Sequence, residues 1–214
     1  MFLLPKGTTF RVKTFNLGII DYLAFGVKGD KKTPAKEYIK DGTRFKIIIQ
    51  SRYDLAESVF NAFSYFVYFG GLGSKSRNGF GSLSLKNDEK LKQGGTHEIR
   101  DYSSLNNRSY LYKKFKEHSA WDKALSEIGL AYRTARLSIP QQKRFLIAKP
   151  IPQLKINERH SKPYFLHVNK LPNGKYKGQI LFMPYKYDDE NKREEYFKVC
   201  ETINKKLTEL CGGK

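Results

Sequence analysis

Five glycines within twelve residues, from Gly70 to Gly81, constrain the fold of this chain more than any other stretch of its sequence. Before them, apolar residues recur at helical spacing, and Asp54 with Glu57 three residues on has the spacing of a capping box. After them, FGSLSL alternates as a strand does. Glycine readily takes the left-handed conformation found just past helix ends, so the sequence predicts a helix over about 54–69, then a tight loop and a strand.

The loop itself, residues 70–83, reads GGLGSKSRNGFGSL and suits the binding of phosphate. Positions without side chains let backbone N–H groups approach a phosphodiester, while the basic, hydroxyl and amide side chains supply charge and neutral hydrogen bonds. GxxxxGK followed by Ser or Thr is absent, and the loop follows a helix and opens a strand, so it is neither a nucleotide-triphosphate loop nor a dinucleotide fingerprint. The open alternative is that the glycines only shape a turn. The phosphate-binding residues predicted here are Gly71, Gly73, Ser74, Lys75, Ser76, Arg77 and Asn78.

The charge of the chain favours a polyanionic partner. It has 40 Lys and Arg against 21 Asp and Glu, a formal charge of +19, and 14 Tyr with 15 Phe. Such an excess of positive charge attracts nucleic acid by releasing counterions, and aromatic rings can stack on bases. The composition therefore indicates a globular RNA-binding protein, with a merely basic, solvated surface as the alternative.

Further periodic segments complete the predicted elements, which are strands at 8–15 and 41–50, a helix at 120–136 capped by Ser119, a hairpin at 163–184 turning at 172–174, and an amphipathic helix at 188–210. The order strand, helix, loop, strand is half of a ferredoxin-like βαββαβ unit, which RNA-recognition motifs share. We therefore expect an α+β, ferredoxin-like (RRM-like) fold in a single domain. Its core would be about 1–90 and 139–187, with a helical insertion at about 100–138 and a C-terminal helix at about 188–211.

Four stretches resemble a known family. The segment GGLGSKSRNGFGS resembles the glycine-rich loop of RAMP proteins, the CRISPR-associated RNA-binding superfamily. YLAFG followed by a basic segment and DGTRF, SAWDKALSEIGLAYRTAR at 119–136, and ERHSKPYFLHV at 158–168 are similar to the first subunit of Cmr-type (type III-B) complexes. Members of that group begin with an additional ferredoxin-like unit, so we expect this chain to correspond to their C-terminal half.

The resemblance implies a non-catalytic subunit of an antiviral type III CRISPR effector complex. Such a subunit would hold guide RNA near its 3′ end, help engage target RNA and contact other Cmr-type subunits. The basic loop at 28–36 and the segment at 158–168 add further RNA-binding candidates, namely Lys28, Lys31, Lys32, Arg159 and His160. The alternative for the three lysines is a solvated face.

The strongest alternative to a non-catalytic role is an enzymatic one. The superfamily includes metal-independent guide-processing endoribonucleases that use a histidine as general acid or base, and here His160 or His167 would serve. His97 and His118 lie in no catalytic motif, and the loop aspartates Asp21, Asp30 and Asp41 are more simply turn residues. We therefore expect no enzymatic activity.

No cofactor, metal, small-molecule substrate or membrane contact is expected. Cys200 and Cys211 lack the paired spacing of a zinc site, and no apolar run is long enough to span a bilayer. The cytoplasm is the expected location. A third function class, a general RNA-binding or ribosome-associated protein, needs only the charge and the aromatic residues, whereas the glycine loop favours the RAMP class.

Overall fold

A computed structural model describes residues 9–12, 15–27, 37–54, 57–85, 98–147 and 160–211, and all structural statements below concern these. They form a mixed α+β structure with antiparallel sheets, which confirms the predicted class.

The main sheet is built on a long hairpin. Strands β5 (Tyr164–Lys170) and β6 (Tyr176–Phe182) pair antiparallel over their whole length, as the sequence predicted. The turn closes where the N–H of Leu171 donates to the carbonyl of Lys175 at 2.7 Å. The short strands β3 (Tyr110–Tyr112) and β4 (Glu117–His118) both pair antiparallel with β6, along the edge that β5 leaves free.

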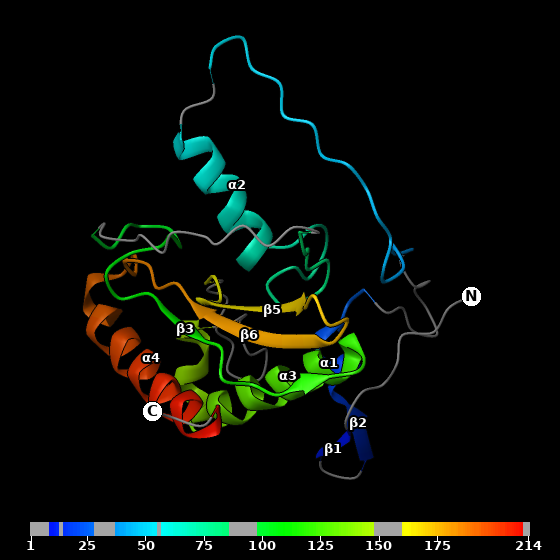
Figure 1. Cartoon of the computed structure of the whole chain (residues 1–214). Helices are drawn as coiled ribbons and strands as arrows, with labels where there is room; N and C mark the ends of the chain where they lie inside the picture. The colour runs from blue at the N-terminus through cyan, green and yellow to red at the C-terminus, as the bar shows by residue number, and fades with distance from the viewer. Residues whose placement is uncertain are drawn as a thin grey trace.

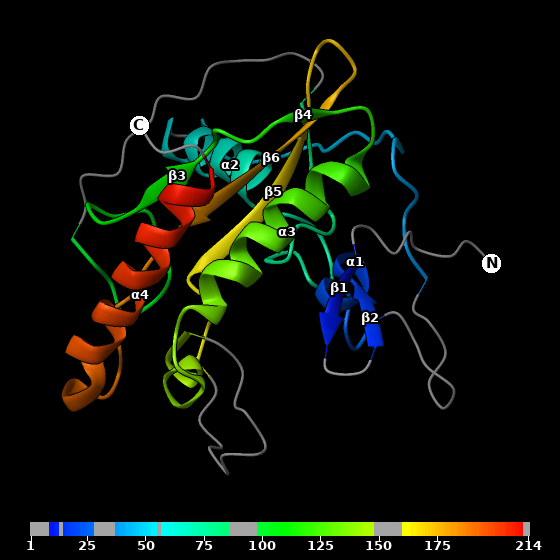
Figure 2. The same cartoon turned by 90° about the horizontal axis from the view of Figure 1, so that it is seen from below.

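Helices cover both faces of this sheet (Figures 1 and 2). Helices α3 (Trp121–Leu137) and α4 (Glu190–Leu210) lie on one face and contact each other, and α2 (Glu57–Phe69) stands on the opposite face. The short helix α1 (Ile19–Leu23) packs against α3, and a 3₁₀ helix, η1 (Gln141–Ile147), packs against α4.

The core lies between the sheet and the α3–α4 layer. Every second residue of the hairpin belongs to this core and meets the buried face of α3, while residues between them, such as Phe165 and Leu181, lie on the side of α2. Full burial of one large aliphatic or aromatic side chain contributes roughly 1.5–3 kcal/mol, so this layer is the main source of stability. The fully buried residues at this junction include Leu125, Ile128, Tyr164, Leu166 and Ile180.

Residues 100–138, predicted as a helical insertion, hold β3, β4 and α3. In the structure these three elements form an edge of the main sheet and the helix that covers its centre. The prediction missed β3 and β4 because strands of three and two residues carry no usable periodicity.

The N-terminal part corrects two predicted strands. The stretch predicted as one strand over 8–15 contains β1 (Thr9–Val12), and the chain then turns back into β2 (Phe15–Gly18), with Val12 paired to Phe15. The strand predicted at 41–50 is wrong, because these residues form no ladder among the described residues and are all exposed. In Figure 1 they belong to a long arch between α1 and α2 that stands away from the body of the molecule, except at Asp41, whose carboxylate accepts from the Tyr176 hydroxyl at 3.1 Å.

Two finer predictions also need correction. FGSLSL is not a regular strand, because the hydroxyl oxygens of Ser82 and Ser84 accept the β5 N–H groups that a neighbouring strand would bind through its carbonyls. The N-cap of α3 is Ala120 and not Ser119, with no side-chain cap, whereas the Asp189 carboxylate caps α4 by accepting from the N–H of Asn191 at 3.0 Å.

Candidate nucleic-acid interface

The glycine loop is closed at its base by the backbone. Helix α2 ends where the N–H of Gly70 donates to the carbonyl of Phe66, and two residues later the N–H of Leu72 donates to the carbonyl of Gly81 at 2.9 Å. Gly79 sits against the core with φ +88°, where a β-carbon would lie 2.5 Å from the Leu125 side chain. The loop is therefore fixed on the body by close backbone packing that only glycine permits.

The tip of the loop faces solvent in an unusual backbone conformation. Gly73 and Lys75 have φ of +80° and +64° on either side of Ser74, and all three residues are exposed. A lysine in the left-handed region costs roughly 1–3 kcal/mol, and such strain concentrates at functional sites. Within the described part of the chain, the N–H groups of Ser74 and Lys75 donate no hydrogen bond. The tip thus presents free backbone donors beside a lysine, which is the chemistry of an anion-binding nest.

Two side chains hold this loop from below. The Asn78 amide donates to the carbonyl of Leu23 at 2.8 Å, and its oxygen accepts from the Lys162 ammonium at 2.7 Å. The same ammonium donates to the carbonyl of Arg77 at 2.6 Å and lies 4.8 Å from the centre of the Tyr132 ring. Asn78 is therefore engaged in positioning the loop, and Lys162, which the sequence reading did not select, is its main support.

The loop region carries concentrated positive charge. Burial, and then the neighbouring Arg77, Arg136 and Lys75, lower the pKa of Lys162 well below its usual value. Burial also lowers the pKa of Arg77. Neither residue has a carboxylate within ion-pair distance in the described ranges, so the basic groups at the loop face one another without a paired anion.

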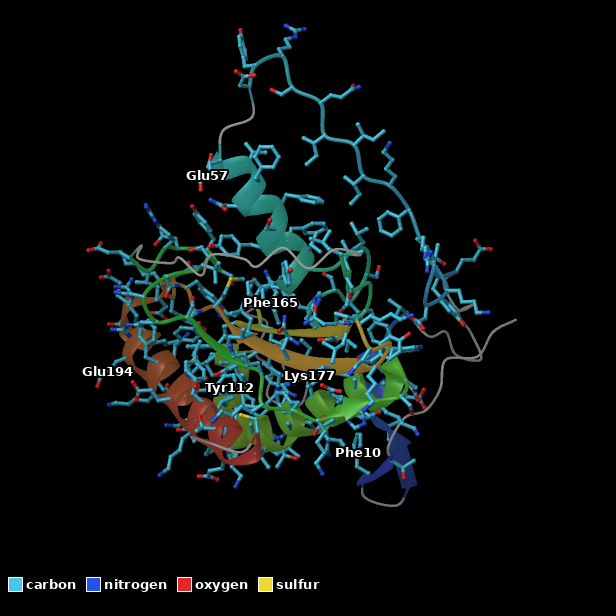
Figure 3. The ribbon with its side chains drawn as sticks, viewed as in Figure 1. Phe10, Glu57, Tyr112, Phe165, Lys177 and Glu194 are labelled. Atoms are coloured by element: carbon cyan, nitrogen blue, oxygen red, sulfur yellow. The ribbon has the colours of Figure 1, made fainter. Side chains whose placement is uncertain are left out.

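Arg77 links the loop to a polar pocket of about 260 Å³. Its guanidinium donates to the carbonyl of Lys162 at 3.2 Å and lies 4.7 Å from the centre of the Phe165 ring. Figure 3 labels Phe165 on the sheet face that α2 covers. The pocket is lined by Arg77, Asp101, Tyr102, Ser103, His160, Ser161, Tyr185 and Asp188.

The predicted site residues fall into three groups. The residues from Gly71 to Asn78 lie together on the loop, and His160 joins Arg77 in the pocket, where its ring lies 4.3 Å from that of Tyr187. Lys28, Lys31, Lys32 and Arg159 lie outside the described residues. The pocket carboxylates were not predicted, because the sequence places Asp188 at the start of the predicted C-terminal helix and Asp101 within the predicted helical insertion at 100–138.

The described histidines differ in their burial and in the groups that they contact. His167 is buried, with Nδ1 2.8 Å from the carbonyl of Gly70 and Nε2 3.1 Å from that of Leu83, so it ties α2 and the loop exit to β5. His118 pairs with Glu127 at 2.9 Å, outside the pocket. His160 is thus the histidine that lies with Arg77 among the pocket residues. The described residues hold no cluster of three or more His, Cys, Asp or Glu that could bind a metal.

No protein-family model, curated protein or solved structure matches this chain, so the family resemblance rests on its own motifs. None of the described helices combines the length and the apolar character that crossing a membrane requires.

Proposed function

We propose that this chain is an RNA-binding protein that holds the phosphate backbone at the tip of its glycine loop. The observation that carries the proposal is the pair of free N–H groups at Ser74 and Lys75, held in a strained conformation beside positively charged side chains. Backbone donors combined with basic side chains bind phosphodiesters without reading sequence. The formal charge of +19 adds long-range attraction for any polyanion.

More particularly, we propose a non-catalytic RAMP subunit of a cytoplasmic type III-B CRISPR complex, with a ferredoxin-like fold, bound to guide and target RNA. The loop motif and the three further stretches support this assignment, as does an antiparallel sheet backed by helices. The conformation of the loop also favours RNA binding, because its tip is exposed to solvent and its base is held on the body by a backbone hydrogen bond.

Partner subunits are supported by the exposed apolar surface of the N-terminal part. Of sixteen exposed large apolar side chains among the described residues, nine lie between Tyr38 and Phe60, on the arch and the start of α2. Exposed apolar side chains concentrated in one region of a protein are typical of interaction sites. We propose that other subunits of the complex cover it.

The test is a charge removal with a matched control. Lys75→Ala removes a cation from the loop tip, and Lys205→Ala removes one from an exposed position on α4. Lys75→Ala should weaken binding to single-stranded RNA and reduce the salt slope of log affinity by about 0.7, the value for one lost phosphate contact. Lys205→Ala should leave the slope unchanged. Equal effects of the two variants would mean that RNA meets only a diffuse positive surface.

A guide-processing endoribonuclease remains the second candidate, because His160 lies beside Arg77 in the pocket. Incubation with labelled guide precursor in the presence of a chelator separates the two functions. Specific cuts that disappear in His160→Ala, with RNA binding retained, would favour the enzyme.

A further inference from the structure

The polar pocket beside the loop contains two carboxylates, Asp101 and Asp188, that phosphate binding does not use. Acidic side chains next to a phosphate site weaken phosphate binding by repulsion. Their presence in a chain of charge +19 therefore indicates a ligand group that donates hydrogen bonds rather than a second phosphate. The pocket also offers a hydroxyl, at Ser103, and an exposed aromatic ring, at Tyr102, whose residue is 67% exposed.

The pocket walls are fixed by contacts between segments that are far apart in sequence. The N–H of Lys186 donates to the carbonyl of Arg100 at 2.6 Å, and the Asn106 amide donates to the carbonyl of Pro184 at 3.0 Å. The Tyr185 hydroxyl donates to the carbonyl of Ser161 at 3.0 Å. The pocket is therefore preformed, which reduces the entropy lost when a ligand binds.

One buried polar atom in the pocket lacks a partner. The hydroxyl oxygen of Ser103 is buried and makes no hydrogen bond to any of the described residues. A buried hydroxyl without a partner costs roughly 1–3 kcal/mol, which a polar ligand group can recover when the Ser103 side chain turns toward the pocket.

The size and chemistry of the pocket select a single base. At about 260 Å³ it is smaller than the usual range for whole ligands, which starts near 300 Å³. A carboxylate accepts two hydrogen bonds side by side, and among the four RNA bases the guanine edge alone presents two adjacent donors, N1–H and the N2 amino group. The guanine O6 can then accept from Arg77.

We infer that this pocket binds an unstacked guanine base of single-stranded RNA, with Asp101 and Asp188 as acceptors for its Watson–Crick edge and Tyr102 stacked on its face. The inference rests on the proposed RNA-binding function, since Arg77 belongs to both the loop and the pocket. RNA-binding proteins commonly read splayed bases in this way, by stacking and edge hydrogen bonds.

The test measures binding of the full chain to labelled eight-nucleotide oligonucleotides. One is oligo(U), and the others carry a single central G, A, C or inosine. The G-containing strand should bind roughly 5- to 150-fold more tightly than oligo(U), the range for a good bidentate contact. Inosine, which lacks the N2 amino group, should lose most of that gain.

Variants then assign the residues. Asp101→Asn and Asp188→Asn should abolish or reduce the guanine preference while leaving oligo(U) binding at least as strong, because each removes one negative charge. Glu201→Gln, an exposed acidic position on α4, is the control for charge alone and should keep the preference. Tyr102→Ala should weaken binding of the G-containing strand by about tenfold through lost stacking.

Three outcomes overturn the inference. If all oligonucleotides bind equally while Lys75→Ala still weakens them, the proposed function stands and the guanine pocket does not. If the aspartate variants strengthen binding of every strand alike, the carboxylates act only as background charge. If they leave the base preference intact but release a partner subunit, the pocket holds a basic protein side chain instead. Absence of any RNA binding would instead refute the proposed function itself.

Discussion

Two short apolar runs, Ile-Leu-Phe at 180–182 and Ile-Ile-Ile at 47–49, behave in opposite ways in this molecule. Ile180 to Phe182 lie in β6, where neighbouring strands bind both edges and all three residues are buried. Ile47 to Ile49 lie in the arch, where they form no ladder and are 43–67% exposed. An apolar strand-forming sequence becomes a strand only when a neighbour supplies hydrogen bonds and a surface to cover.

The helices show the same contrast. Helix α3 buries eight of its residues, from Ala124 to Ala135, against the sheet and its neighbours. Helix α2 is rich in aromatic residues, yet among its residues Val67 alone is buried, and Figure 3 shows Glu57 at the end of α2 far from the sheet. The C-terminal part of the described chain is therefore stabilised internally, whereas the arch and the start of α2 leave most of their large apolar side chains exposed.

Matched isoleucine substitutions test this contrast most strongly. Ile180→Ala should lower the free energy of unfolding by about 2–5 kcal/mol, because it opens a cavity at a fully buried position. Ile48→Ala, at a residue 67% exposed, should change it by less than about 0.5 kcal/mol. Urea unfolding measures both. A large loss in Ile48→Ala would mean that the arch packs on the protein in solution.

Limited proteolysis gives the next largest expected effect. Trypsin should cut after Arg44 and Lys46 in the exposed arch roughly 100-fold faster than after Lys123 and Arg133 in α3, where cleavage requires the helix to open. Mass spectrometry of the first fragments identifies the sites. Similar rates at the two regions would contradict the division, and protection of the arch by a co-expressed subunit would identify what covers it.

A smaller difference in stability is expected between Asn78, which holds the loop on the body, and Lys75 at the loop tip. Asn78→Ala should reduce the unfolding free energy by about 1–3 kcal/mol, because it leaves the Leu23 carbonyl without its side-chain donor and removes one of the two hydrogen-bond acceptors of the buried Lys162 ammonium. Lys75→Ala, at the exposed tip, should change stability by less than about 0.5 kcal/mol. Thermal unfolding of the two variants is the measurement. Equal stability losses would show that the tip, too, is part of the packed structure.

The smallest expected effect is a pH dependence that arises at the junction of α2 with the sheet. Burial lowers the pKa of His167 below its usual 6.5, although its hydrogen bonds to Gly70, Asn169 and Leu83 act in the other direction. The unfolded chain then binds a proton that the folded chain does not, so stability present above pH 6.5 should fall as the pH drops below it.

His167→Gln should remove that share of the pH dependence, and unfolding free energies of both proteins between pH 5 and pH 8 test it. The range spans 6.5, the ordinary pKa of a histidine side chain. If the wild type instead gains stability relative to His167→Gln as the pH falls, the hydrogen bonds outweigh burial and the ring is held as a cation.

The helices and the hairpin could be predicted from sequence because their signals are local. The helical spacing in α2, α3 and α4 and the turn before Lys175 each lie within one short segment. The predicted strand at 41–50 failed because pairing depends on a distant partner, which periodicity cannot reveal.

The candidate site divides in the same way. The glycine loop is one continuous stretch and could be found by its composition. The pocket draws on Arg77, on 101–103, on 160–161 and on 185–188, which only the folded chain brings together. Lys162 was missed because lysine is a surface residue by default, and its role as a support depends on burial.

The hydrogen bond between Leu72 and Gly81 has a consequence for how this protein can vary. This bond closes the base of the loop, so the residues at its tip are held apart from the packed body of the protein. Because the free energy of closing a loop rises only slowly with its length, one or two residues inserted between Gly73 and Ser76 should leave the body of the protein folded. Recognition could therefore diversify between related chains, or be redesigned by grafting, without any compensating change in the sheet beneath.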